Sequence, residues 1–184
     1  MRNSESRVGD CRKVRRTGAC TSEKLRTMKT ATTSAGKTKT DTRIVDALNQ
    51  VLADAYALMA LTHLAHWNIE GSDFFELHKA FQKQYEALFE AVDDIAERVR
   101  ALDAYAIGGL NKLARTAAMD EFTSPMPQKD YVAGLIVAHE KIMDDIARAR
   151  HLAGEVDDLE TQDLMMKQQQ FHQKTVWMLK SVLK

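Results

Sequence analysis

The chain of 184 residues is long enough for one domain of ordinary size with an extension. Only two prolines and eight glycines interrupt a composition rich in Ala, Leu, Lys, Glu and Gln, which argues against an all-β sandwich or barrel and favours an all-α fold. Lys and Arg together number 26, as do Asp and Glu, so the formal net charge is zero.

The charge is unevenly distributed along the chain. Residues 1–40 contain 11 Lys and Arg against three acidic residues, a net charge of +8, so residues 41–184 carry −8. Up to about Asp41 there is no aromatic residue and no sustained apolar period, so residues 1–41 are predicted to form a disordered basic N-terminal arm. Met28 offers a later start, which would make residues 1–27 an artefact of an early start codon. Cys11 and Cys20 have no Cys or His neighbours at zinc spacing, and we interpret them as incidental thiols.

Beyond Asp41, apolar residues recur with a helical period in four long segments. The pattern predicts helices over about 43–68, 73–102, 128–153 and 158–183, with a short helix over about 110–118. Glycines and prolines fall between these segments, where helices end. Residues 42–184 are therefore predicted to form a four-helix bundle whose second and third helices are joined by a crossover that contains the short helix.

No apolar run approaches the roughly 18 residues needed to span a bilayer, and the N-terminus lacks the apolar stretch of a secretory signal. We therefore expect a cytoplasmic protein that has no membrane partner.

The second predicted helix carries potential metal ligands. Four polar residues lie within about 100° of one another on its surface: His78, Gln82, Asp93 and Glu97. His78 and Asp93 are nevertheless about 22 Å apart along the helix axis, so one helix cannot place both on one ion. Antiparallel packing against a second copy, with the two-fold axis near Tyr85–Phe89, would bring His78 of one chain to Asp93 and Glu97 of the other.

Imidazole and carboxylate together suit iron, with manganese or zinc as competitors. The same residues have a simpler interpretation that the spacing leaves open. Acidic residues one turn apart often form a solvated flank of a helix, and a single histidine near a helix end is often structural.

Two short motifs resemble the signature of a known family. They are His-Trp-Asn-x-x-Gly at 66–71 with Phe75-x-x-His78, and Asp93-x-x-x-Glu97-Arg98 fifteen residues after His78. They are similar to the Dps family, the DNA-binding proteins from starved cells within the ferritin-like superfamily, and the resemblance covers about residues 43–184. It implies a ferritin-like bundle that assembles as a dodecamer, oxidises Fe(II) with hydrogen peroxide or O2, and stores ferric mineral. Such a protein would protect nucleoid DNA against oxidative stress.

The resemblance also implies roles for individual residues. His66 and His78 match the histidine ligands that one subunit supplies to a di-iron site at the two-fold interface, and Asp93 and Glu97 match the carboxylates of its partner. Gln82 stands where the family usually has Asp or Glu, so the second iron is expected to bind more weakly or indirectly. A true ferritin would instead use Glu-x-x-His motifs, which this chain lacks.

Neighbouring aromatic residues are given two interpretations each. Trp67 would intercept stray oxidising equivalents, or its side chain would simply pack against its neighbours. His63 would support the metal ligands from the outer shell of the site, or it would be an ordinary exposed or packed histidine. No role is assigned to the remaining histidines, which are His139, His151 and His172.

Two charged regions complete the predictions. Asp158 and Asp163 lie where the family places its three-fold pores and would attract iron there, unless they only cap the last helix. Lys29, Lys37, Lys39 and Arg43 would contact DNA phosphates without reading sequence, unless the arm is merely solubilising.

Two other functions remain open at this point. One is a non-specific DNA-compacting protein whose metal site is weakened by Gln82, and the other is a structural helical assembly with no chemistry.

Overall fold

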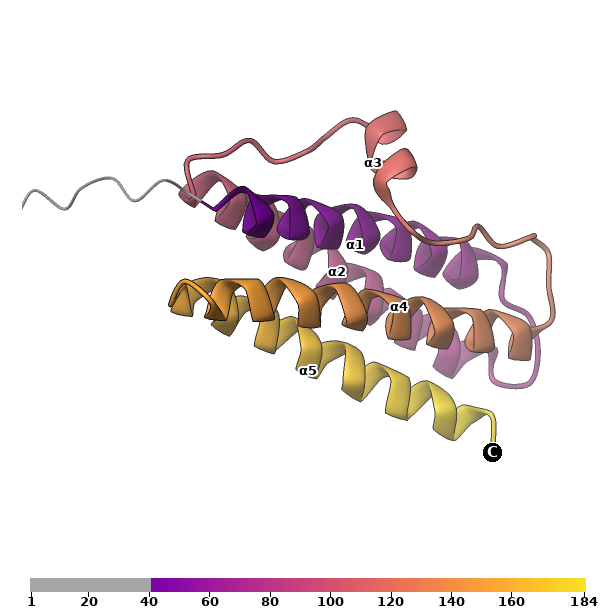
Figure 1. The fold of residues 1–184 in the computed structure, drawn as a ribbon. Coiled ribbons are helices and arrows are strands. Elements are labelled where there is room, and N and C mark those ends of the chain that lie inside the picture. The colour runs from indigo at the N-terminus through magenta and orange to yellow at the C-terminus, as the bar shows by residue number, and fades with distance from the viewer. Residues whose placement is uncertain (1–40) are drawn as a thin grey trace, which may run out of the picture. The chain divides into compact units, whose positions relative to one another are not determined.

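The computed structural model describes residues 41–184, which form five helices and contain no strand (Figure 1). The helices are α1 (Thr42–Asn68), α2 (Phe74–Ala101), α3 (Leu110–Thr116), α4 (Gln128–Gly154) and α5 (Leu159–Val182). The predicted all-α bundle with a short helix in its crossover is confirmed, and each predicted helix end lies within two residues of the observed one. The predictions for the basic arm, including Cys11, Cys20, Lys29, Lys37 and Lys39, lie outside the described residues.

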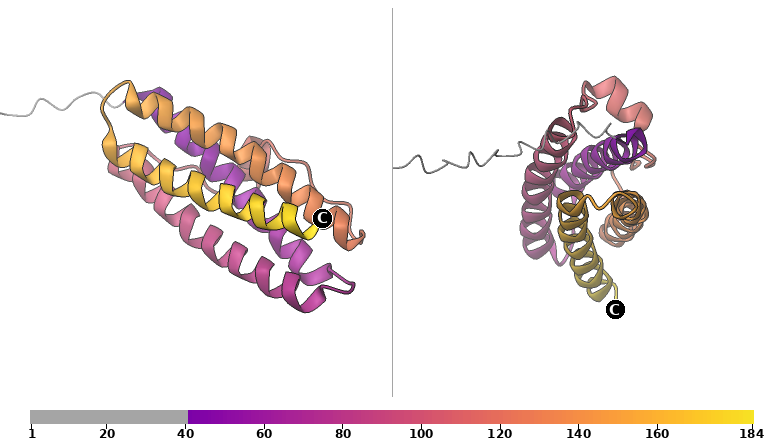
Figure 2. Two further views of the ribbon diagram at one scale, coloured as in Figure 1. Left: turned by 90° about the horizontal axis from the view of Figure 1, so that it is seen from below. Right: turned by 60° about the vertical axis from the view of Figure 1, so that its left-hand side comes forward.

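The four long helices form two antiparallel hairpins, α1 with α2 and α4 with α5 (Figures 1 and 2). α1 also packs against α4, and α2 packs against α5. The crossover between α2 and α4 runs the length of the bundle and carries α3 alongside α1. It returns the chain to the end of the bundle at which α1 finishes, so α4 can run antiparallel to α1.

The core consists of apolar side chains that recur with a helical period along the long helices. Burying each large aliphatic or aromatic side chain contributes on the order of 1.5–3 kcal/mol to folding. The largest fully buried side chains of the core come from all four long helices and include Leu48, Leu58, Phe81, Leu88, Leu135, Ile142, Ile146 and Met165. α1 is long and apolar enough to cross a membrane by length and composition alone, but about half of it is buried against the other helices of this bundle.

Polar side chains of α1 fix the crossover in place. Asn49 accepts a hydrogen bond from the Ile107 backbone N–H at 2.9 Å, and Gln50 donates to the Thr116 carbonyl at 3.0 Å. The fully buried Asp54 accepts from the Ala118 backbone N–H at 2.8 Å, and burial raises the pKa of its carboxyl. These contacts hold α3 against α1.

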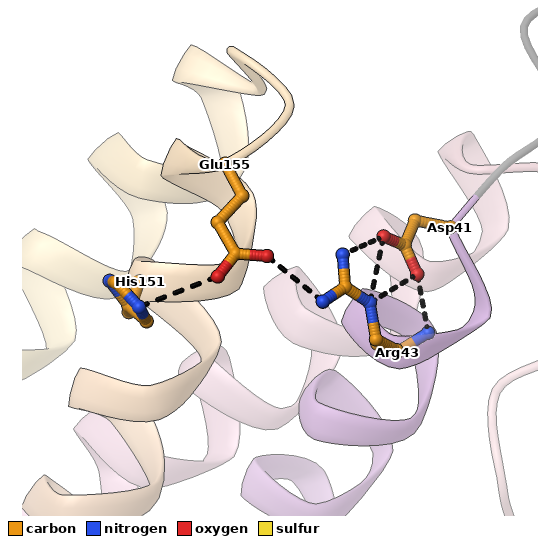
Figure 3. A network of polar contacts seen from close by, with 4 residues as sticks. All are labelled: Asp41, Arg43, His151 and Glu155. Atoms are coloured by element: carbon orange, nitrogen blue, oxygen red, sulfur yellow. Dashed lines mark hydrogen bonds and ion pairs between the residues drawn. The ribbon is translucent and has the colours of Figure 1, made fainter.

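An ion-pair network joins the start of α1 to the end of α4 (Figure 3). Asp41 caps α1 by accepting from the Arg43 backbone N–H, and the Arg43 guanidinium contacts Asp41 at 2.6 Å and Glu155 at 2.9 Å. The hydrogen bonds that Arg43 donates to both carboxylates raise its pKa, so its charge is offset within the bundle. His151 Nε2 lies 3.5 Å from the other oxygen of Glu155. The DNA contact proposed for Arg43 stays a prediction, and any phosphate would compete with these two carboxylates.

His139 on α4 and His172 on α5, to which the sequence assigned no role, form a buried pair. Their Nδ1 atoms lie 2.8 Å apart, and the two side chains are 0% and 1% exposed. One Nδ1 must therefore carry a proton and the other accept it. Within residues 41–184 the Nε2 of His139 finds no hydrogen-bond partner. Burial lowers the pKa of His139 to about 3, and burial together with His139 lowers that of His172.

Candidate metal centre

His66 and His78 lie face to face where α1 ends and α2 begins. Their ring centroids are 3.7 Å apart and the ring planes are inclined by 22°. Each ring bonds to the backbone of the other residue, because His66 Nδ1 lies 2.8 Å from the His78 carbonyl and His78 Nδ1 lies 2.9 Å from the His66 carbonyl. A carbonyl oxygen can only accept, so both Nδ1 atoms must be protonated. In the neutral rings both Nε2 atoms then keep a free lone pair, which is the form that binds a metal ion.

The turn between the two helices makes this arrangement possible. Gly71 adopts a positive φ of 136°, which L side chains rarely adopt. A Cβ at this position would also lie 2.5 Å from Oε1 of Gln128 on α4. Because glycine at position 71 allows this tight turn, His66 in the last turn of α1 lies against His78 near the start of α2.

The predicted carboxylates lie far from this pair in the same chain. Asp93 and Glu97 are exposed on α2, about 22 Å and more along the helix from His78. Within residues 41–184 no group of three or more His, Cys, Asp or Glu side chains lies close enough to hold a metal ion. A site that uses both the imidazoles and these carboxylates therefore needs a second chain.

Several large apolar side chains are exposed on α1, α2 and α3. Trp67 is 68% exposed, Phe89 67% and Leu110 81%. A groove of about 570 Å³ between α1 and the crossover is lined by Tyr56, His63 and Trp67, among others, and a second of about 290 Å³ is lined by Phe89 and Asp93. Clustered exposed aromatic side chains commonly mark a protein interface. The expected position of the two-fold axis, near Tyr85 and Phe89, falls on this surface.

A row of rings connects the histidine pair to Trp67. The Tyr85 ring lies 5.2 Å from that of His66 and 4.1 Å from that of His63, and His63 stacks on Trp67 at 5.3 Å. Burial, with a smaller electrostatic effect of the neighbouring His66 side chain, lowers the pKa of His63, which favours its neutral form. His63 therefore contacts Tyr85 and Trp67 and has no ring contact with His78. Sequence reasoning missed this role of Tyr85, although its position seven residues after His78 puts it on the same face of α2.

Gln82 is exposed on α2, and its Nε2 donates to Glu86 Oε1 at 2.8 Å. Its side chain makes no other hydrogen bond within the described part of the chain. The carbonyl oxygen of Gln82 is therefore free to bind an ion, and sequence reasoning missed the contact with Glu86.

The two acidic residues predicted to line a pore have different environments. Asp158 caps α5 by accepting from the Thr161 backbone N–H at 3.0 Å, and it pairs with Arg98 at 2.6 Å. Burial alone would raise the pKa of Asp158, but the hydrogen bonds from Arg98 and Thr161 outweigh it, and the pKa is lowered. Asp163 is exposed and pairs with Lys167 at 2.7 Å. The contacts of Asp158 are those of a helix cap, as the simpler interpretation expected. The pore role of both residues stays a prediction.

Comparison with known proteins identifies the family. A family model described as a ferritin-like domain matches residues 45–184. An uncharacterised low-temperature-induced protein of Nostoc sp. is 34% identical over 142 residues, which cover 76% of this chain and 79% of that protein. The DNA protection during starvation protein of Brevibacillus brevis is 29% identical over 147 residues, with 80% and 99% covered.

Solved structures agree with this assignment. The Dps protein of Vibrio cholerae O1, described as a member of the ferritin-like diiron-carboxylate proteins, superimposes with a TM-score of 0.76 at 31% identity and covers 80% of this chain and 92% of its own. By its fold, its matched domain and these relatives, the chain belongs to the Dps family of the ferritin-like superfamily.

Proposed function

We propose that the protein is a ferroxidase of the Dps type, which oxidises Fe(II) with hydrogen peroxide, or with O2, and stores the ferric product in a dodecameric shell. The single observation that carries this proposal is the facing pair of His66 and His78, whose Nδ1 atoms bond to backbone carbonyls and leave both Nε2 atoms free. This pair supplies only nitrogen donors. The proposal therefore adds Asp93 and Glu97 of a second copy as the carboxylate ligands.

In this scheme Fe(II) is the substrate. The two imidazoles hold it without adding charge, while the carboxylates of the second copy offset the positive charge that grows on oxidation. Two Fe(II) ions each give one electron to hydrogen peroxide, which takes up two protons and yields two water molecules. The reaction consumes iron and peroxide together, and this would limit hydroxyl-radical formation near DNA. We place the protein in the cytoplasm, associated with the nucleoid.

The remaining predicted residues have supporting roles in this proposal. Asp163, with its exposed carboxylate, and Asp158 would draw Fe(II) toward the shell. Trp67, at the exposed end of the row of rings, would take up stray oxidising equivalents.

The test adds Fe(II) to the protein under anaerobic conditions and then adds peroxide, while ferric absorbance is followed. We expect a rise that is faster than in a protein-free control and that ends in a soluble ferric product. Light scattering on the same sample should give the mass of twelve chains. An absorbance trace equal to that of the protein-free control would refute the ferroxidase.

Replacing Gln82 with Glu should strengthen binding of the second Fe(II). The substitution adds a negative charge where the family usually has one, and attraction to a divalent ion at contact distance is large even when water screens it. We expect the affinity of the second position for Fe(II) to rise about tenfold, because ligand charge and ligand support set metal affinity on this scale. The measurement is an anaerobic Fe(II) titration by calorimetry.

The matched control for this change is Gln170→Glu, which adds the same charge at an exposed position on α5. Its Fe(II) titration should match that of the wild-type protein. If Gln82→Glu also matches the wild type, Gln82 does not contribute to the second iron position.

Deleting residues 1–40 should remove DNA binding and leave iron oxidation unchanged. The deleted segment has a net charge of +8, whereas the remainder carries −8 and would repel phosphate. Twelve arms on one particle would add avidity and give a steep dependence on salt. The measurement is a gel-retardation assay at low and at physiological salt. Retardation of DNA by the shortened protein, to the same extent as by the full chain, would exclude the arm as the contact.

A further inference from the structure

Gln82 and Glu86 form a hydrogen-bonded pair one helical turn apart on α2. Gln82 Nε2 donates to Glu86 Oε1 at 2.8 Å, and both side chains are exposed. Glu86 makes no other hydrogen bond or ion pair within residues 41–184. The pair continues from His78 in steps of four residues, so His78, Gln82 and Glu86 follow one another along the same side of the helix.

The chemistry of an amide gives this contact a consequence for iron binding. A glutamine side chain ends in a carbonyl oxygen that can bind a cation and in an NH2 group that repels one. Free rotation about the last bond would let either group face the ion. Because Glu86 accepts a hydrogen bond from the NH2 group, it favours the rotamer in which that group points away from His78 and the oxygen remains free.

We propose that Glu86 is a positioning residue for the second iron, and that it acts by orienting the Gln82 amide so that Oε1 faces the ion. This inference rests on the proposed function, since it concerns the same site. A carboxylate at position 82 would have two equivalent oxygens and would need no such partner. Glu86 therefore matters in this chain because of the substitution that distinguishes it from the usual family pattern.

A simpler account is that the pair only stabilises the helix surface, as many i, i+4 contacts do. The two accounts differ in what a metal titration would show. A surface contact would leave the affinity for a second metal ion unchanged, whereas an orienting residue would change it only while position 82 is Gln.

The experiment is a Co²⁺ titration of the assembled full-length protein by calorimetry, with Co²⁺ absorbance bands followed in parallel. Co²⁺ reports binding and coordination without oxidation. We compare the wild type with Glu86→Ala, with Gln82→Glu, and with Gln82→Glu combined with Glu86→Ala, since alanine leaves no acceptor for the Gln82 NH2 group. Glu90→Ala is the matched control, because Glu90 is exposed on the next turn of α2 and its removal deletes the same charge without touching Gln82.

Glu86→Ala should weaken the weaker Co²⁺ position about tenfold, as is typical when a residue that orients a ligand is lost, and change the tighter one less than about twofold. Glu90→Ala should change both less than about twofold. With Glu at position 82, removing Glu86 should also have an effect below about twofold, because no amide remains to be oriented.

Any of the following titration results would overturn the role of Glu86. They are a Glu86→Ala titration equal to that of the wild type, equal losses for Glu86→Ala and Glu90→Ala, and an equal loss with Gln or Glu at position 82. A wild-type protein that binds only one Co²⁺ per site also overturns it, since no second ion remains to be served. If the wild type binds no Co²⁺ at either position the proposed function fails as well, whereas two ions that bind independently of Glu86 refute Glu86 alone.

Discussion

Alanine in place of His78 should lower the rate of Fe(II) oxidation by about 100-fold, because the change removes a ligand, and even residues that only support ligands change metal affinity 10- to 100-fold. It also removes the ring that stacks on His66 at 3.7 Å, while the hydrogen bond from His66 Nδ1 to the backbone carbonyl of residue 78 remains. His66→Ala should have the same effect for the same reason. The measurement is the stopped-flow rise in ferric absorbance at saturating peroxide.

The matched control for the histidine variants is His151→Ala. His151 is exposed in the last turn of α4, and within residues 41–184 its side chain pairs with Glu155 alone. The His151→Ala protein should oxidise iron at the wild-type rate. Circular dichroism should show the same helix content in all three variants. If His78→Ala retained more than about a third of the wild-type rate, the facing histidines would not be the iron ligands.

Acid should destabilise the bundle through the buried pair of His139 and His172. In the unfolded chain His139 takes up a proton below about pH 6.5, whereas in the folded chain its pKa is about 3. The folded state therefore loses stability as the pH falls from about 6.5 to about 3, by about 1.4 kcal/mol for each pH unit. At pH 4.5 the free energy of unfolding should be lower by about 2–3 kcal/mol from His139 alone. His172, whose pKa is also lowered, acts in the same direction.

Urea unfolding at a series of pH values measures this loss. The double variant His139→Leu, His172→Leu should show a shallower dependence on pH, while the exposed His151→Gln should follow the wild type. An NMR titration of the wild-type imidazoles gives an independent test, since His139 should not titrate between pH 7 and 4. Parallel stability curves for the wild type and the double variant, or titration of His139 near pH 6, would show that the pair is not held neutral.

The helices could be predicted from the sequence because their signals are local. Apolar residues at three- and four-residue steps along α2, such as Leu77, Phe81 and Leu88, became its buried face. The first helix ended at Asn68, as the sequence predicted, with Gly71 in the turn that follows. The separation of His78 and Asp93 followed from helix rise alone, so the sequence already implied that a shared site needs two chains.

The contacts that the sequence did not reveal depend on how helices are rotated and aligned against one another. His139 and His172 are 33 residues apart on different helices, and nothing local to either residue indicates that α4 and α5 bring them to 2.8 Å. The hydrogen bonds from Nδ1 of His66 and Nδ1 of His78 to backbone carbonyls likewise depend on the turn at Gly71. Arg98 lies on α2, so its ion pair with Asp158 could be found only once α2 and α5 were placed side by side.

The central claim, that two chains share each iron site, is tested most directly by mixing two inactive variants. His78→Ala lacks an imidazole, and Asp93→Ala combined with Glu97→Ala lacks the carboxylates, so each assembly alone should be inactive. When the two are unfolded together and reassembled in equal amounts, half of the interfaces pair unlike chains, and each of these contains one intact site of two. The account predicts recovery of about a quarter of the wild-type rate. A mixed assembly as inactive as its parents would show that the imidazoles and carboxylates do not meet across an interface.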